Sequence, residues 1–200
     1  MPQLTCILLA AGLSQRMGTT NKLLLPYQDQ TILTTTLQQL HQSIIDHIIV
    51  VTGFEDTKIK RVLQTFPNLQ VIHNPEYQEG MTSSIQSGLE ALQAPETAIM
   101  IALGDMPLLR AADYNRLIQH FKRICEKEET PIVRPIYQKQ IGHPVIFHEK
   151  YIEALKRQKG KQGCRAIIKA HPTDFRGMQT EHLAYVRDID TPDDYQQWKQ

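Results

Sequence analysis

Apolar residues follow two different patterns along this chain of 200 residues. Continuous apolar runs rich in β-branched residues are typical of strands buried on both faces, whereas apolar positions at helical spacing indicate amphipathic helices. The runs predict strands over residues 4–10, 47–52, 69–73, 98–103, 132–135, 145–147 and 185–189. The periodic segments predict helices over residues 31–42, 55–66, 82–92, 111–126, 150–157, 165–170 and 193–198.

The alternation of strands and helices predicts an α/β protein with three layers, in which a mainly parallel sheet carries helices on both faces. The length suits one hydrophobic core, so we expect a single domain over residues 1–200. Ligands bind to such sheets at the carboxyl ends of the strands. The segments that follow predicted strands are therefore the first places to look for function.

The segment after the first strand is rich in glycine and basic residues and poor in acids. It has the sequence LLAAGLSQRMG over residues 8–18 and NKLLLP over residues 21–26, and no Asp or Glu precedes Asp29. Gly12 and Gly18 allow backbone N–H groups to approach a ligand closely, and Arg16 and Lys22 can neutralise phosphate charge. These features predict a polyphosphate-binding loop, although a plain surface turn with solvated charges is the structural alternative.

Motif spacing and composition exclude several classes of protein. The chain contains neither G-x-x-x-x-G-K-[ST] nor G-x-G-x-x-G, so a P-loop NTPase or a dinucleotide-binding dehydrogenase is not the first choice. Basic and acidic residues number 22 and 21, which argues against nucleic acid as the main partner. Three widely spaced cysteines indicate neither a disulfide frame nor a zinc site. Without a membrane-length apolar run or a signal-peptide pattern, we expect a cytoplasmic protein with no membrane partner.

Two carboxylates follow predicted strands and are candidates for metal binding. Asp105 lies in a Gly-Asp-Met-Pro turn after residues 98–103, and Asp190 lies in Asp-Ile-Asp-Thr at the end of the last predicted strand. Acids beside a polyphosphate loop suggest Mg²⁺ held by one or two carboxylates, phosphate oxygens and waters. The structural alternatives are an Asx-turn at Asp105 and a helix N-cap at Asp188 or Asp190, with Thr191 competing for the cap.

Polar groups in the middle and late parts of the chain have both structural and functional interpretations. Gly80 and the hydroxyls of residues 82–84 precede a helical pattern, so they either begin a helix or bind the sugar or base of a nucleotide. His143 lies in Gly-His-Pro and is either a ligand contact, a general acid/base or an ordinary loop histidine. Arg165 and Lys169 offer cations to an anionic acceptor, with solvated surface charge as the default.

Taken together, the motifs resemble those of the MobA-like nucleotidyltransferases, and within them the molybdenum cofactor cytidylyltransferase branch. This branch includes proteins that serve xanthine dehydrogenase maturation and purine breakdown. The resemblance runs nearly end to end through LAAG-x-S-x-R-M-G (9–18), NKLL (21–24), NP (74–75), GM-x-SSI (80–85), GDMP (104–107), GHP (142–144) and DIDTP (188–192).

The resemblance implies a Rossmann-like nucleotide-diphospho-sugar transferase fold and a reaction in which an NTP and a phosphate monoester give a nucleotidyl-pyrophosphate linkage and free pyrophosphate. It also implies roles for individual residues of this chain. Nucleotide binding is implied for Ala10, Ala11, Gly12, Arg16, Lys22, Gly80, Ser83 and Ser84, catalysis for Arg16, Lys22 and Asp105, Mg²⁺ binding for Asp105 and Asp190, and acceptor binding for Gly142, His143, Pro144 and Arg165.

The resemblance further implies CTP as the nucleotide, molybdopterin cofactor as the acceptor and a molybdoenzyme such as xanthine dehydrogenase as a target. Ala11 together with Asn21-Lys22 resembles the CTP-using branch. Two departures fall in the acceptor half: residues 136–141 lack a glycine, and Lys161 stands where such enzymes often carry an acid. The alternatives are a nucleotidyltransferase acting on a sugar or polyol phosphate and a non-catalytic cofactor-binding maturation chaperone.

Overall fold

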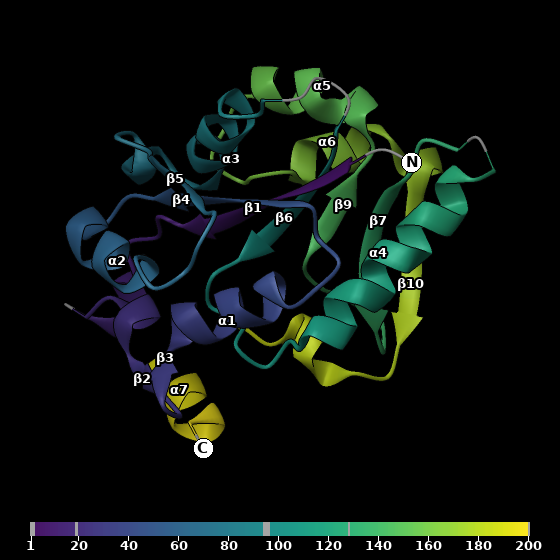
Figure 1. Cartoon of the computed structure of the whole chain (residues 1–200). Helices are drawn as coiled ribbons and strands as arrows, with labels where there is room; N and C mark the ends of the chain where they lie inside the picture. Colours follow the sequence, from purple (N-terminus) through teal and green to yellow (C-terminus); the bar gives the residue numbers. More distant parts are fainter. Residues whose placement is uncertain (1–2, 19, 94–96, 128, 200) are drawn as a thin grey trace.

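A mixed β-sheet forms the centre of the molecule (Figure 1). The computed structural model describes residues 3–18, 20–93, 97–127 and 129–199. Within these ranges eight strands form the sheet, in the order β10-β7-β9-β6-β1-β4-β5 with β8 paired to β7. The strands are β1 (Gln3–Ala10), β4 (His47–Thr52), β5 (Gln70–His73), β6 (Thr97–Leu103), β7 (Ile132–Tyr137), β8 (Gln140–Ile141), β9 (Val145–Phe147) and β10 (Phe175–Thr180).

Helices cover both faces of this sheet. In Figure 1, α3 (Met81–Glu90), α5 (Ile152–Arg157) and α6 (Arg165–Ala170) lie above it, and α1 (Ile32–His41) and α4 (Ala111–Cys125) lie below it. The remaining helices in the described ranges with α geometry are α2 (Asp56–Leu63) and α7 (Pro192–Trp198). A short hairpin of β2 (Pro26–Tyr27) and β3 (Gln30–Thr31) lies beside α7, where the Tyr195 hydroxyl donates to the Pro26 carbonyl at 2.7 Å.

The three layers follow from the strand sequences. On β1, Cys6 and Leu8 belong to the apolar cluster shared with α1 and α4, whereas Ile7 between them belongs to the cluster shared with α3 and α5. Because successive side chains of a strand point to opposite faces, a continuous apolar run can fill both clusters. The predicted class, a mainly parallel sheet with helices on both faces, is confirmed.

Strand direction brings several chain segments to one edge of the sheet. β1 pairs in parallel with both β4 and β6. β5 pairs in parallel with β4, and β10 pairs in parallel with β7. β9 is antiparallel to both β6 and β7. The residues that precede β9 therefore lie at the same edge as those that follow β1 and β6. This edge is where a ligand site is expected in such sheets.

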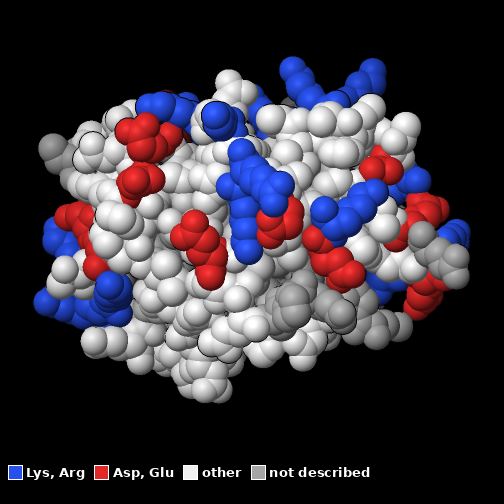
Figure 2. Space-filling view, turned by 90° about the horizontal axis from the view of Figure 1, so that it is seen from above, with Lys and Arg blue, Asp and Glu red and all other residues white. Residues whose placement is uncertain are grey.

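The local predictions are confirmed for most elements. The strand over His47–Thr52 and the helix over Arg165–Ala170 agree at both ends, and most of the other predicted elements differ by a few residues at their ends. The face covered by α3 and α5 carries basic and acidic side chains interspersed (Figure 2), in keeping with the net charge of +1. Among the described residues, no helix has the length and apolar character needed to cross a membrane.

One prediction is wrong: residues 185–189 do not form the final strand. Leu183–Val186 forms a 3₁₀ helix, and the strand at that edge of the sheet is β10, which sequence reasoning missed. β10 contains Gly177 and alternates with polar residues, so it lacks the β-branched run that marks a buried strand. Tyr185 and Ile189 are buried, but neither side chain belongs to a strand of the sheet.

Candidate active site

A cleft of about 650 Å³ lies at the carboxyl ends of β1 and β6. Its walls come from the loop after β1, the turn after β6, the start of α3 and the segment before α7. Eight of the residues singled out in the sequence line it: Ala11, Gly12, Arg16, Lys22, Gly80, Ser84, Asp105 and Asp190. Segments far apart in the sequence therefore converge on one cavity.

The loop after β1 is held by its own polar side chains. Ser14 adopts a left-handed backbone conformation with φ 53°, and its hydroxyl accepts a hydrogen bond from the Lys22 amide at 3.1 Å. Asn21 caps a short 3₁₀ helix over Lys22–Leu24 by accepting from the Leu23 amide at 3.1 Å. These bonds fix the backbone on both sides of the loop, so that the Lys22 side chain, only 11% exposed, points into the cleft floor.

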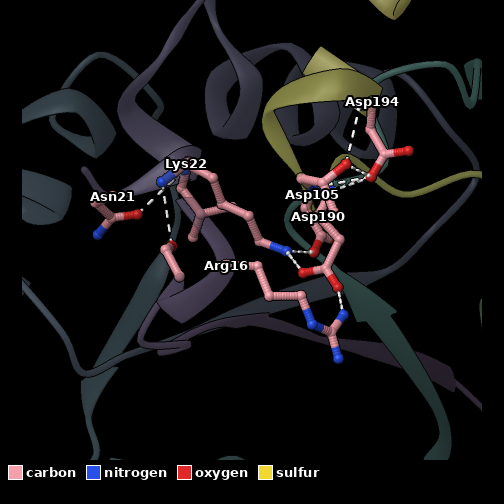
Figure 3. A network of polar contacts seen from close by, with 9 residues as sticks. Arg16, Asn21, Lys22, Asp105, Asp190 and Asp194 are labelled. Atoms are coloured by element: carbon pink, nitrogen blue, oxygen red, sulfur yellow. Dashed lines mark hydrogen bonds and ion pairs between the residues drawn. The ribbon is translucent and has the colours of Figure 1, made fainter. Parts of the chain in front are cut away.

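Lys22 lies between the two predicted metal carboxylates (Figure 3). Its ammonium group is 2.6 Å from Oδ2 of Asp105 and 2.8 Å from Oδ1 of Asp190. Arg16 forms an ion pair with the other carboxylate oxygen of Asp190, and its side chain is 72% exposed. The network therefore links the buried pair of Lys22 and Asp105 in the floor of the cleft, through Asp190, to Arg16 at the surface of the cleft.

Burial dominates the electrostatics of Asp105. Loss of solvent raises the pKa of this carboxyl above its usual value, and the nearby Lys22 ammonium opposes that rise. Oδ1 of Asp105 is buried and has no hydrogen-bond partner among the described residues. A buried carboxylate oxygen without a partner costs free energy, so this atom is suited to a ligand that supplies positive charge.

Thr191 takes the N-cap of α7. Its hydroxyl accepts from the Asp194 amide at 3.1 Å, and the Asp194 carboxylate accepts in return from the Thr191 amide at 2.8 Å. This capping box leaves the Asp190 side chain available to Lys22 and Arg16. The N-cap alternative for Asp190 is thereby excluded.

The donor set suits a hard divalent cation. No group of three or more His, Cys, Asp or Glu side chains that could hold a metal occurs among the described residues. Mg²⁺, however, typically binds to one or two carboxylates and completes its shell with phosphate oxygens and waters. Asp105 and Asp190, with the unpartnered Oδ1 of Asp105, fit that mode of binding.

The hydroxyls at the start of α3 divide between local structure and the cleft. Ser83 donates to the Gly80 carbonyl at 2.9 Å, and Thr82 accepts from the Gly163 amide at 3.1 Å, so both stabilise the backbone. Ser84 lines the cleft and accepts from the Asn74 side chain at 3.0 Å. The helix-start interpretation is therefore confirmed for Thr82 and Ser83, whereas Ser84 is the hydroxyl of this run that lines the cleft.

Some of the predicted site residues lie outside the cleft lining. Ala10 is buried in the core, and none of Ser83, Gly142, His143, Pro144 and Arg165 is among the lining residues. Conversely, Asp188, Tyr77, Gln78, Met81 and Lys161 line the cleft without having been singled out for it. Tyr77, Gln78 and Met81 lie within three residues of Gly80, and Asp188 lies two residues before Asp190, so the motifs around Gly80 and Asp190 were the available signal. Lys161 comes from a loop whose position only the fold reveals.

A mainly parallel sheet whose carboxyl edge carries a basic glycine loop and paired carboxylates is the architecture of a nucleotidyltransferase with a Rossmann-like fold. The model of the MobA-like NTP transferase domain matches residues 6–175, and the chain belongs to this family. It is accordingly a nucleotidyltransferase.

Individual relatives cover almost the whole chain. The molybdenum cofactor cytidylyltransferase of Escherichia coli K12 is 30% identical over 98% of this chain and 95% of its own length. The purine catabolism protein PucB of Bacillus subtilis is 26% identical over 97% of this chain and 95% of its own length. Rv0371c of Mycobacterium tuberculosis superposes with a TM-score of 0.82 at 28% identity, covering 98% of this chain and 97% of the other. The structure of Rv0371c with manganese has a TM-score of 0.79 at 25% identity, over 99% and 98%.

Proposed function

We propose that this enzyme transfers CMP from CTP to the phosphate of molybdopterin cofactor and releases pyrophosphate. The observation that carries the proposal is the convergence of Lys22, Asp105 and Asp190 in one cleft with the Gly12 loop. A relative named as a molybdenum cofactor cytidylyltransferase, alike over nearly its whole length, supports this choice of nucleotide and acceptor.

The proposed chemistry needs no general base. A phosphate monoester has a second pKa near 6 and is largely a dianion at neutral pH, so it is already a nucleophile. The enzyme then has to hold the two substrates in line and neutralise charge on the α-phosphate and the departing pyrophosphate. A lysine and an arginine at the cleft are suited to that task.

The proposal gives each of the predicted site residues a role. Gly12 and the backbone around Ala10 and Ala11 would approach the nucleotide, while Arg16 and Lys22 would bind the triphosphate. Asp105 and Asp190 would hold Mg²⁺, which neutralises phosphate charge when bound. Gly80, Ser83 and Ser84 would contact base or ribose, with Ser83 acting through the backbone that it holds.

Gly142, His143, Pro144 and Arg165 would belong to the acceptor site. The proposed product supports maturation of a molybdoenzyme of the xanthine dehydrogenase type, and the similarity to a purine catabolism protein is in keeping with that role. We propose that the reaction takes place in the cytoplasm.

Pyrophosphate release measured with each NTP, with and without molybdopterin cofactor, tests the proposal. Release that requires both CTP and the cofactor is expected. Release only with a sugar or polyol phosphate would reassign the acceptor, and nucleotide binding without any release would indicate a non-catalytic maturation chaperone. Lys22→Ala and Asp105→Ala should each lower turnover by about a hundredfold, comparable to the loss of one preorganised charge. Unchanged rates in folded variants would contradict the assigned roles.

A further inference from the structure

A second set of basic groups lies beside the cleft and is not part of its lining. It consists of Arg134 on β7, His143 before β9 and Arg165 at the start of α6, and we call it the basic cluster. Both arginines act on the pKa of the His143 imidazole, and Arg165 acts on that of Arg134, so the three groups lie within electrostatic range of one another. Among the described residues, neither arginine forms an ion pair with an acid.

Arg134 is held in place by the loop that carries His143. Its Nε donates to the Gly142 carbonyl at 2.9 Å, and the side chain is half-buried. Only Nε of the guanidinium is used in this way, so the remaining N–H donors of the group stay available for a ligand. A half-buried arginine without an acid partner retains its charge and favours an anion.

His143 offers an unsatisfied nitrogen at the same place. Its backbone amide donates to the Tyr185 carbonyl at 2.8 Å, which fixes the loop. The side-chain Nδ1 is buried and has no partner among the described residues. Burial and the two arginines lower the pKa of the imidazole to about 3, so at neutral pH the ring is uncharged and can donate one hydrogen bond.

The basic cluster and the cleft share one edge of the sheet. Val145 of β9 pairs with Ile101 of β6, and continuing this antiparallel register brings His143 level with Leu103, which lines the cleft. On the other side, the Gly163 amide donates to Thr82 at the start of α3, which ties the segment before Arg165 to the cleft wall. A ligand bound at the basic cluster would thus adjoin a nucleotide bound in the cleft.

We propose that Arg134, His143 and Arg165 bind the phosphate dianion of the acceptor, while Arg16 and Lys22 serve the nucleotide. This inference rests on the proposed transfer to a phosphate monoester. Two anions must come together in that reaction, and each needs its own cations because Lys22 is already shared between two carboxylates. A planar guanidinium recognises phosphate oxygens in pairs, which suits Arg134 and Arg165 to this ligand.

Binding of inorganic phosphate to the protein alone tests the site directly. The probe is the NMR signal of the His143 imidazole, which separates this site from the cations of the cleft. Arg134→Gln keeps an N–H donor for the Gly142 carbonyl, and Arg165→Gln alters an exposed side chain, so both variants should fold. Arg176→Gln is the matched control, since Arg176 lies on the adjacent strand β10 and already pairs with Glu129 at 2.6 Å.

Phosphate is expected to shift the His143 signal in the wild type. Each of Arg134→Gln and Arg165→Gln should weaken the phosphate affinity read from that signal by about tenfold, as for the loss of one charge-assisted pair, whereas Arg176→Gln should not. In the transfer assay the two variants should raise KM for the acceptor with little effect on CTP binding. No shift of His143, or equal affinities in all four proteins, would overturn the proposal. Arginine-dependent phosphate binding in a wild type that transfers no nucleotide would reject the proposed function and leave the anion site standing.

Discussion

The ammonium group of Lys22 lies 2.6 Å from Oδ2 of Asp105, in the floor of the cleft. The same nitrogen is 2.8 Å from Asp190. The lysine proposed to bind triphosphate and the acids proposed to bind metal therefore neutralise one another when no ligand is bound. A metal and Lys22 would compete for the same two carboxylates, and a triphosphate that draws Lys22 towards itself would relieve this competition. Metal and nucleotide should consequently bind with positive coupling.

Replacing Lys22 tests this coupling, because loss of the lysine should strengthen metal binding rather than weaken it. Lys22→Met should bind Mn²⁺ more tightly than the wild type in the absence of nucleotide, by about tenfold, which is within the ordinary range of coupling between sites. Electron paramagnetic resonance of free Mn²⁺ measures the affinity. Lys161→Met is the control, because Lys161 lines the same cleft but pairs with Glu79. Unchanged or weaker Mn²⁺ binding in Lys22→Met would show that the lysine does not compete with the metal.

The two neighbouring carboxylates of the cleft, Asp105 and Asp188, should differ in importance. Asp105→Asn preserves size but removes a charge beside Lys22, so turnover should fall by about a hundredfold. Asp188 lines the cleft, is exposed and pairs with no basic group among the described residues, and Asp188→Asn should change turnover by less than about threefold, as for an exposed charge. Steady-state pyrophosphate release at saturating Mg²⁺ compares the two. Similar losses in both variants would mean that pairing with Lys22 is not what distinguishes Asp105.

Two glycines should respond differently to the same added methyl group. A Cβ on Gly142 would lie 2.2 Å from the Tyr185 carbonyl oxygen, so Gly142→Ala should lower the free energy of unfolding by about 1–3 kcal/mol. A Cβ on Gly12 meets nothing within 4 Å, so Gly12→Ala should leave stability unchanged. Because Gly12 lines the cleft, its variant should instead raise KM for the nucleotide. Urea denaturation and nucleotide titration measure the two effects. A loss of stability in Gly12→Ala would mean that the added methyl group collides with other atoms of the protein.

Stability should fall on mild acidification because of His143. Burial and two arginines lower the pKa of its imidazole from 6.5 to about 3 in the folded protein. Between these values the unfolded chain binds a proton that the folded protein excludes, so the free energy of unfolding decreases as pH falls, by at most about 1.4 kcal/mol per pH unit. Above pH 6.5 the effect is absent. Urea denaturation from pH 7 to pH 4.5 should show a steeper decline for the wild type than for His143→Gln. Equal slopes would mean that the His143 imidazole has the same pKa in the folded and unfolded states.

Short-range signals in the sequence account for most of the local structure. The apolar run at His47–Thr52 and the periodic segment at Arg165–Ala170 agree with the structure at both ends, because burial of those side chains determines the local conformation. Edge strand β10 was missed, since a strand with one free edge needs no continuous apolar run. Residues 185–189 look like a strand, yet a long-range backbone bond from Ile189 to the Asp105 carbonyl at 2.9 Å replaces a ladder.

The candidate site likewise combines features that the sequence predicted with features that only the structure shows. Glycines, cations and acids at the ends of predicted strands indicated the polyphosphate loop, Asp105 and Asp190, since residue type alone limits which chemistry is possible. The contribution of Lys161 to the cleft depends on contacts between distant segments, and the bond from Arg134 to the Gly142 carbonyl depends on how β7 packs against the loop before β9.

The sequence by itself thus determined the layered α/β class, most of the helices and strands, and the chemical nature of the loop after β1, because these depend on neighbouring residues. Only the tertiary structure decided that Lys22 meets Asp190, 168 positions away, and that Thr191 rather than Asp190 caps α7. Strand order placed the segments that follow β1 and β6 at one edge of the sheet, and the antiparallel direction of β9 brought the residues before β9 to the same edge. That arrangement depends on how the whole set of apolar faces packs, which no local pattern encodes.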